Sequence, residues 1–355
     1  MRGLPIVAIV SVVFLAAACT TIESPVLDEW PEQRIAETDP ILGGRYVIEP
    51  RQDVVGELQV IRTNHEDTFV DIGRAYGLGY DELVAANPDV DPWLPGADTE
   101  VVLPTRFVLP EAPREGLVLN IAAKRLFYFP PVADGEPRIV ETYPIGIGRE
   151  GWATPTGATE VVAKARDPVW FVPASVRKEH EEAGDPLPRQ VPPGPDNPLG
   201  RYVLGLGLPG YLIHGTNKPA GVGMRVSHGC VRLFPENIES LYERVDIGVE
   251  VRIVNQPFLF GQSGNDLVFE AHAQLEDDER DLESSLVQQA RAGLVGYADE
   301  VTLLDEERIL RLAEQARGFP VSVISWRPDT SATVRAARPV VNIIEQNRVA
   351  DQNFD

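Results

Sequence analysis

The sequence contains only two cysteines in 355 residues, and one of them, Cys230, ends the motif Ser227-His228-Gly229-Cys230. The other, Cys19, follows an apolar N-terminal run, so the rest of the chain carries a single thiol. A lone thiol is a liability in an oxidising compartment unless it does chemistry. We therefore take Cys230 as a candidate nucleophile, and a fold of this chain has to place a base near it.

Two histidines are candidates for that base. His228 precedes Cys230 by two residues, so in an extended segment the two side chains share a face. His214 follows a short predicted strand over 211–213, and an adjacent strand would bring it beside the thiol. Because free cysteine is mostly protonated at neutral pH, we expect a nearby imidazole to take the proton and lower the pKa of Cys230.

The residues around the thiol fit acyl transfer. Gly229 has no side chain, so a substrate carbonyl can approach the backbone amides of Gly229 and Cys230, two candidate donors to an oxyanion. Arg232 is placed to bind a carboxylate, either of the substrate or of the protein. The residues alone thus indicate a thiol acyltransferase or hydrolase.

Two alternatives use the same residues without this chemistry. A lone cysteine is commonly buried and inert. His214, His228 and Cys230 would also supply three ligands to a zinc ion, but the sequence shows no fourth ligand and no His-Glu-x-x-His motif.

Composition excludes one class of partner. The formal net charge is −22 at pH 7 and no basic patch is visible, so we expect no nucleic-acid partner. Apolar residues make up 43% of the chain, enough to build buried cores in two or three domains.

The N-terminus is typical of a secretory signal. The apolar run over 4–18 is shorter than the roughly 20 residues of a membrane span. Its end, Leu15-Ala16-Ala17-Ala18-Cys19, resembles a bacterial lipobox, which implies lipidation of Cys19; an ordinary signal peptide is the alternative. Thr20 after the cysteine favours the outer membrane. We expect a signal peptide over 1–18 and a polar tether over 19–45.

Segment 46–104 predicts a strand at 58–61, two helices and a closing strand at 100–103. Asp67 or Thr68 can cap the first helix and Gly77 can end it. This βααβ pattern resembles a LysM domain, which implies binding to the glycan of peptidoglycan; a structural unit without ligand is the alternative. The motifs that carry the resemblance are Asp67-Thr68, Ile72-Gly73, Tyr76-Gly77, Asp81-Glu82-Leu83, Ala86-Asn87-Pro88 and Val102-Leu103-Pro104. The long acidic turn at 89–98 departs from the family.

Segment 113–254 is mainly β, because short β-rich runs alternate with turn residues. Predicted strands are 117–121, 125–128, 139–143, 160–163, 211–213 and 249–254. One helix is expected over 236–244. A proline-rich insertion over 186–198 is too long for a turn, and such loops often serve as lids.

The remaining segment, 255–355, predicts an α+β extension. Its strands are expected at 267–271 and 321–324, and its helices at 278–292 and 305–317. Asp305 caps the second helix and Gly318 closes it.

Ordered motifs across 113–254 resemble the YkuD-type catalytic domain of bacterial L,D-transpeptidases. They are Gly146-Ile147-Gly148-Arg149, Thr154-Pro155-Thr156-Gly157, Asp167-Pro168-Val169-Trp170, Asn197-Pro198-Leu199-Gly200, Ile213-His214-Gly215-Thr216 and Ser227-His228-Gly229-Cys230-Val231-Arg232-Leu233. The resemblance implies a multidomain protein with a small α+β LysM domain, a mainly-β catalytic domain and an α+β C-terminal extension.

The same resemblance implies roles for the site residues. Cys230 would be the acylated nucleophile and His214 the general base, oriented by the carbonyl of Gly215. Ser227, His228 and Gly229 would shape the site and its oxyanion pocket, and Arg232 would bind substrate or support the loop. No metal or organic cofactor is implied.

The implied substrate is the tetrapeptide stem of peptidoglycan, in the periplasm. An amine on another stem would give a 3–3 crosslink, an outer-membrane lipoprotein would become attached to the wall, and water would give a carboxypeptidase or hydrolase. The motifs do not distinguish these acceptors. A non-catalytic peptidoglycan-binding lipoprotein is the competing hypothesis.

Overall fold

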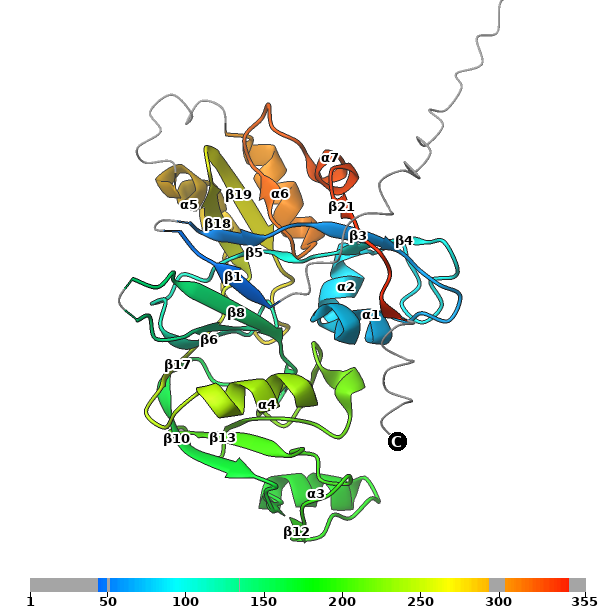
Figure 1. Ribbon diagram of the computed structural model, residues 1–355, viewed down its shortest axis with the longest axis vertical. Helices are drawn as coiled ribbons and strands as arrows, with labels where there is room; N and C mark the ends of the chain where they lie inside the picture. The colour runs from blue at the N-terminus through cyan, green and yellow to red at the C-terminus, as the bar shows by residue number, and fades with distance from the viewer. Residues whose placement is uncertain (1–43, 50–51, 134, 294–303, 345–355) are drawn as a thin grey trace, which may run out of the picture.

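The computed structural model describes residues 44–49, 52–133, 135–293 and 304–344 (Figure 1). The predicted signal peptide, Cys19 and most of the tether lie outside these residues. The tether was expected to run to residue 45, but Arg45 already begins β1 (Arg45–Val47), which pairs with β8 (Ile139–Pro144). The chain therefore enters the main sheet near the start of the described part.

A nine-stranded mixed sheet forms the centre of the molecule, in the order β1-β8-β7-β6-β17-β10-β13-β14-β16. Two of its pairs, β17 with β6 and β14 with β16, are parallel, and the others are antiparallel. The strands not yet located are β6 (Gly116–Asn120), β7 (Arg125–Phe129), β10 (Gly157–Arg166), β13 (Tyr202–Leu206), β14 (Leu212–His214), β16 (Val231–Arg232) and β17 (Glu250–Val254).

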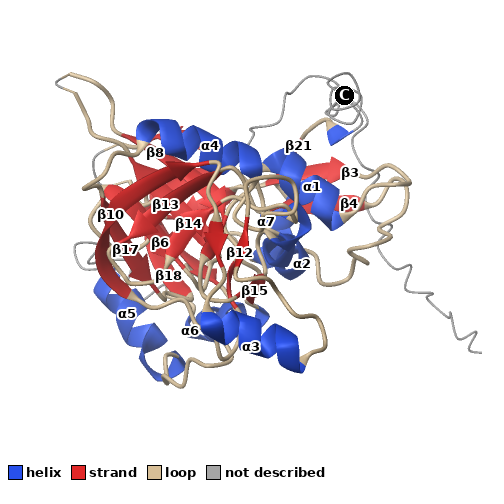
Figure 2. Ribbon diagram, turned by 90° about the horizontal axis from the view of Figure 1, so that it is seen from below, coloured by secondary structure: helices blue, strands red, loops and turns tan. Residues whose placement is uncertain are grey.

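Helix α4 (Pro235–Arg244) lies along one side of this sheet and packs on β13 (Figure 2). Its buried residues Ile238 and Leu241 join a core with Ile213 and Val231 from the strands that flank the site. The mainly-β prediction for this segment is confirmed. The missed strand β13 is a continuous apolar run interrupted by Gly205, without the alternation that marks a half-buried strand.

The βααβ unit consists of β3 (Gln59–Arg62), α1 (Phe69–Tyr76), α2 (Tyr80–Ala86) and β4 (Glu100–Leu103). Thr68 caps α1 in a reciprocal capping box with Asp71, and Gly77 ends it in the left-handed conformation with φ of 65°. These are the elements that the sequence pattern predicts.

The βααβ unit is docked firmly on the main sheet. Its buried residues Ile72 and Leu83 share one apolar cluster with Phe127 and Val140 of the sheet. Within this contact, Arg125 of β7 binds both carboxylate oxygens of Glu82 at 2.7 Å, and the two residues are 1% and 7% exposed. Bidentate geometry makes this a strong, directional ion pair.

The C-terminal extension contains β18 (Phe258–Ser263), β19 (Asp266–Ala271), α5 (Leu286–Gly293), α6 (Glu306–Gln315), β20 (Val321–Ser322), α7 (Thr330–Arg335) and β21 (Arg338–Pro339). Strand β21 pairs in parallel with β3 and so adds a third strand to the small sheet of the βααβ unit (Figure 1). The extension therefore packs against the βααβ unit and shares a sheet with it.

Two helix boundaries in the extension differ from prediction. The helix expected over 278–292 begins only at Leu286, after a 3₁₀ turn at Glu283–Ser285, because the acidic residues before it lack an apolar period. The helix capped by Asp305 ends before Ala316, which adopts the left-handed conformation with φ of 46°. Gly318, the predicted stop, lies beyond it.

The remaining elements lie around the sheet. They are β2 (Val54–Gly56), β5 (Arg106–Val108), β9 (Ile147–Gly148), β11 (Trp170–Phe171), α3 (Ala174–Glu182), β12 (Gln190–Val191), the 3₁₀ turn η1 (Pro219–Gly221) and β15 (Arg225–Ser227). No helix among the described residues is long and apolar enough to cross a membrane.

We predict that Arg125→Met lowers the free energy of unfolding by about 3–5 kcal/mol, because it leaves the Glu82 carboxylate buried without its cation. Chemical denaturation measures this loss. The double replacement Arg125→Met with Glu82→Leu should recover most of this lost stability.

The exposed pair Arg74–Glu236 joins the same two units and serves as the control, with side chains 46% and 48% exposed. Arg74→Ala should lower the free energy of unfolding by about 1 kcal/mol or less. Equal losses for both arginines would contradict this account.

Candidate active site

The parallel pairing of β14 with β16 brings the two principal candidates together. Ile213 lies opposite Val231, and His214 lies opposite Arg232. Because side chains alternate along a strand, Ile213 and Val231 point to one face while His214 and Arg232 point to the other, and Cys230 directly precedes β16. The pairing therefore brings the histidine at the end of β14 next to the strand that begins directly after the cysteine, although the two residues are sixteen apart in sequence.

Hydrogen bonds hold the loop that carries the thiol in one conformation. The Ser227 hydroxyl accepts from the amide of Gly229 at 3.1 Å and donates to the carbonyl of Cys230 at 2.5 Å. Thr154 donates its hydroxyl to the carbonyl of Gly229 at 2.9 Å and accepts from the amide of Gly148 at 3.0 Å. The loop is thus tied to itself and to the segment after β9.

Gly229 is required by this geometry. Its φ is +100°, a region that residues with a side chain rarely adopt, and an added Cβ would lie 3.0 Å from the Tyr211 ring. The bend also means that the segment is not extended, so the premise for His228 and Cys230 sharing a face does not hold. In addition, the Gly229 amide is already engaged by Ser227, which leaves the Cys230 amide as the candidate oxyanion donor of this loop.

The thiol lies in a partly enclosed position. Cys230 is neither fully buried nor exposed, and its Sγ donates to the carbonyl of Gly210 at 3.6 Å. Burial raises the pKa of Cys230 above its ordinary value, while a hydrogen bond from the Leu212 backbone and the charge of Arg232 act in the opposite direction. This corrects the expected lowering, because desolvation outweighs the neighbouring donors.

His214 is almost completely buried, with 3% of its surface exposed. Its Nδ1 lies 2.6 Å from the carbonyl oxygen of Gly215, which only accepts, so Nδ1 carries the proton and Nε2 is the acceptor nitrogen of the neutral ring. The Leu199 backbone is a second hydrogen-bond partner of the ring. Burial and then the charge of Arg232 lower the pKa of His214 to about 4. The resting pair is therefore a neutral thiol and a neutral imidazole.

His228 points to a different set of partners. Its Nε2 lies 3.0 Å from Glu179 Oε2 of α3 and 3.1 Å from the guanidinium of Arg149, which also pairs with Glu179. The Trp152 ring meets the His228 ring edge-on, with centroids 4.9 Å apart. Burial lowers the pKa of His228, and the hydrogen bond to Glu179 opposes this.

Arg232 lies at the base of the site. Its backbone exchanges two hydrogen bonds with Gly146, at 2.8 and 2.9 Å, which joins the Gly146-Ile147-Gly148-Arg149 motif to β16. Its Nε is buried and has no hydrogen-bond partner among the described residues. Arg232 therefore places a positive charge close to both Cys230 and His214.

The described residues contain no group of three or more His, Cys, Asp or Glu side chains arranged to hold a metal ion. The zinc alternative at His214, His228 and Cys230 therefore gains no support from the geometry. The different orientations of the two histidines are the physical reason.

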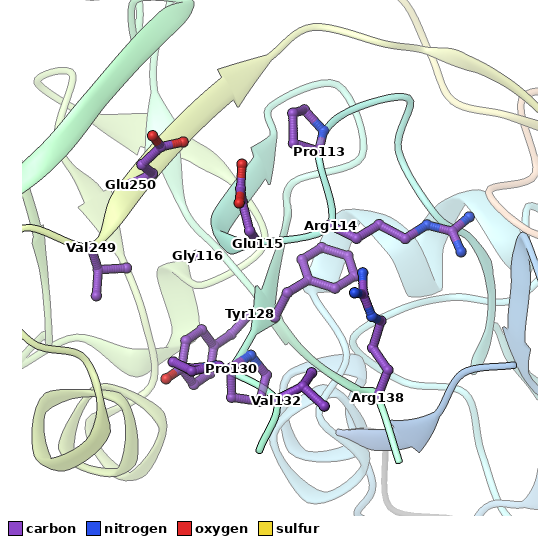
Figure 3. A pocket seen from close by; sticks show the side chains of 12 residues that line it. Pro113, Arg114, Glu115, Gly116, Tyr128, Pro130, Val132, Arg138, Val249 and Glu250 are labelled. Carbon is purple, nitrogen blue, oxygen red and sulfur yellow. The ribbon is translucent and has the colours of Figure 1, made fainter. Parts of the chain in front are cut away.

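Two cavities border the catalytic domain. One of about 630 Å³ has Glu115, Tyr128, Arg138 and Glu250 in its lining and no residue of the cysteine loop (Figure 3). A smaller one, of about 260 Å³, lies between Thr154 and Asp277 of the C-terminal extension, behind the loop that Thr154 supports. Neither cavity is lined by a residue of the loop 227–230.

Sequence reasoning assigned no role to several residues that hold the site together. Thr154 and Arg149 stand in motifs that were recognised, so a search for polar residues within those motifs could have found them. Glu179 lies in α3, a helix without an apolar period in which only Val176 is buried, so no sequence pattern points to it.

Comparison with known proteins identifies the family of this chain. The family described as YkuD, L,D-transpeptidase catalytic domain, matches residues 114–253. A Salmonella typhimurium protein named "Probable L,D-transpeptidase ErfK/SrfK" is 35% identical over 273 residues, which cover 75% of this chain and 85% of that protein. An Escherichia coli protein named "Probable L,D-transpeptidase YcfS" is 36% identical over 289 residues, which cover 80% and 87%. Both alignments extend beyond the residues matched by the family. The chain therefore belongs to the L,D-transpeptidase family of enzymes.

Proposed function

We propose that this enzyme transfers a peptidoglycan peptide through a thioester on Cys230, with His214 as the general base. The observation that supports the proposal is the β14–β16 pairing, because His214 ends β14, Cys230 directly precedes β16, and the charge of Arg232 acts on both groups. Membership in the L,D-transpeptidase family supports the reaction class.

The first half-reaction starts from the neutral pair. When the stem peptide is bound, the Cys230 Sγ proton passes to His214 Nε2 as sulfur attacks the carbonyl at the L-centre of diaminopimelate. The Gly215 carbonyl holds Nδ1–H and so stabilises the imidazolium that forms. The C–N bond to D-alanine then breaks, and His214 returns the proton to the leaving amine.

The second half-reaction releases the enzyme. An acceptor amine attacks the thioester carbonyl, His214 takes its proton, and the C–S bond breaks to regenerate the thiol. In both halves the Cys230 amide is the loop donor available to the oxyanion, since Ser227 occupies the Gly229 amide. Arg232 lowers the energy of the developing negative charge nearby.

The acceptor is an amine of a second stem, which gives a 3–3 crosslink, or of an outer-membrane lipoprotein, which attaches that protein to the wall. Water as acceptor would make the enzyme a carboxypeptidase or hydrolase. Mass spectrometry of muropeptides after incubation with tetrapeptide-rich sacculi separates these products: a crosslinked dimer, a peptide-linked remnant or a tripeptide.

The βααβ unit is proposed as a LysM domain that binds the glycan of the same polymer. Its departure from the family, the turn at 89–98, is ordered: Asp91 accepts from the amides of Trp93 and Leu94, at 2.8 and 3.1 Å. Chemical-shift changes on adding an N-acetylglucosamine oligomer should fall within 46–104. Changes confined to the residues around Cys230 would contradict this assignment.

The N-terminal run and Cys19 support export and lipidation, which would hold the enzyme at the outer membrane facing the periplasm. Intact-mass analysis of the protein from membranes tests this, with Cys19→Ser as the control. A mature chain without a lipid mass would favour an ordinary signal peptide.

We predict that a carbapenem forms a covalent adduct on this enzyme and that Cys230→Ala abolishes both the adduct and any change in muropeptides. The reason is that Cys230 is the only thiol among the described residues. Intact-mass spectrometry measures the adduct. Remodelling of sacculi by the alanine variant would refute the cysteine mechanism, and a wild-type protein that binds sacculi without an adduct would favour a non-catalytic binder.

We also predict an unusual pH dependence. Acylation should decline only as the pH falls through about 4, well below the ordinary histidine value of 6.5, because burial keeps His214 unprotonated above that point. Without substrate, the rate of Cys230 alkylation by iodoacetamide should still be rising with pH at 9.0, the ordinary thiol pKa, and should level off only above it, since the thiolate is the reacting form. Fast alkylation at neutral pH would instead indicate a preformed thiolate.

A further inference from the structure

We propose that Glu179 of α3 is a positioning residue, which holds the His228 ring in one tautomer and thereby fixes the backbone that carries the nucleophile. This inference rests on the proposed role of Cys230 and goes beyond it. The observation behind it is the contact of Glu179 Oε2 with His228 Nε2 at 3.0 Å, across 49 residues of sequence.

Helix α3 belongs to an ordered insertion, residues 167–201, between β10 and β13. Its base is closed by the hydrogen bond from the Asp167 amide to the Arg201 carbonyl at 2.7 Å. Inside it, the fully buried Asn197 donates to the carbonyls of Pro168 and Pro192, at 2.8 and 3.1 Å. These internal hydrogen bonds support the helix that presents the Glu179 carboxylate to His228.

The protonation of the ring follows from its partners. A carboxylate only accepts, so His228 Nε2 carries a proton and donates it to Glu179. A protonated Nε2 cannot accept a hydrogen bond from Arg149. The Arg149 guanidinium therefore donates to Glu179, with which it forms an ion pair. In the neutral His228 ring Nδ1 therefore carries no proton. His214 has the opposite tautomer, with the proton on Nδ1.

The position of the His228 ring affects the Cys230 thiol through the backbone that joins the two residues. His228 is joined directly to Gly229, whose amide and carbonyl are held by Ser227 and Thr154. Trp152 supports the other side of the ring, with the two planes at 85°. Removing Glu179 frees the ring to turn, and the Gly229–Cys230 backbone loses one of its anchors. Small displacements of a nucleophile cost large factors in rate.

Charged and titratable groups face His228 from three sides. Glu179 and His180 lie on α3, with the His180 ring centroid 6.2 Å away. Arg149 comes from the segment after β9, and Arg232 acts from β16. Glu179 is the only carboxylate among the described residues that is hydrogen-bonded to the ring.

The test compares Glu179→Ala and Glu179→Gln with Glu182→Ala, which removes an exposed carboxylate from the same helix. We expect Glu179→Ala to slow carbapenem acylation of Cys230 by about tenfold or more, with unchanged non-covalent affinity. Glutamine keeps an acceptor oxygen and should restore part of the rate, and Glu182→Ala should match the wild type. Melting temperatures check that each variant is folded.

Two further measurements decide whether Glu179 acts through His228. In a His228→Gln background, Glu179→Ala should have no further effect on acylation. Imidazole ¹⁵N spectra of the wild-type protein should show His228 protonated at Nε2 and unprotonated at Nδ1 at neutral pH. Independent rate losses, or protonation at Nδ1, would overturn the proposal. If the wild-type protein forms no adduct at all, the failure lies with Cys230 as nucleophile, not with Glu179.

Discussion

The parallel pairing of β14 with β16 is the interaction on which the site depends. One register places His214 and Arg232 on the same face, with Cys230 directly before β16, whereas a slip of one residue would turn every side chain of β16 to the other side. The buried pair Ile213 and Val231 on the opposite face belongs to the main core, so apolar packing fixes this register. The geometry of the candidate site is thus a consequence of core packing.

The βααβ unit also packs against the segment that connects β14 to β16. Gly79, at the start of α2, packs so closely on Gly223 that a Cβ on either residue would clash with the other's backbone. Nearby, Arg225 of β15 donates to the carbonyl of Gly148 at 3.1 Å and pairs with Asp277 of the C-terminal extension. The N-terminal unit, through its Glu82–Arg125 pair, and the extension therefore hold the segment that leads from His214 to Cys230 from two sides.

Much of the fold was predictable because its signals are local. The capping box of Thr68 and the left-handed Gly77 bound α1, and alternating β-rich runs marked β6, β7 and β17. The two-residue strand β16 and helix α3 could not be predicted, because each is stabilised by partners distant in sequence. The same holds for the site: the motifs named His214 and Cys230, but the pKa directions depend on burial, and the Glu179 contact depends on tertiary placement.

The most direct test of the central claim is a crystal structure of the carbapenem-acylated enzyme. The account predicts continuous density from Cys230 Sγ to the former lactam carbonyl, with His214 Nε2 facing the thioester and Nδ1 still bound to Gly215. The carbonyl oxygen should lie within hydrogen-bond distance of the Cys230 amide. A bond to another residue, or a thioester turned to the face of Ile213 and Val231, would contradict it.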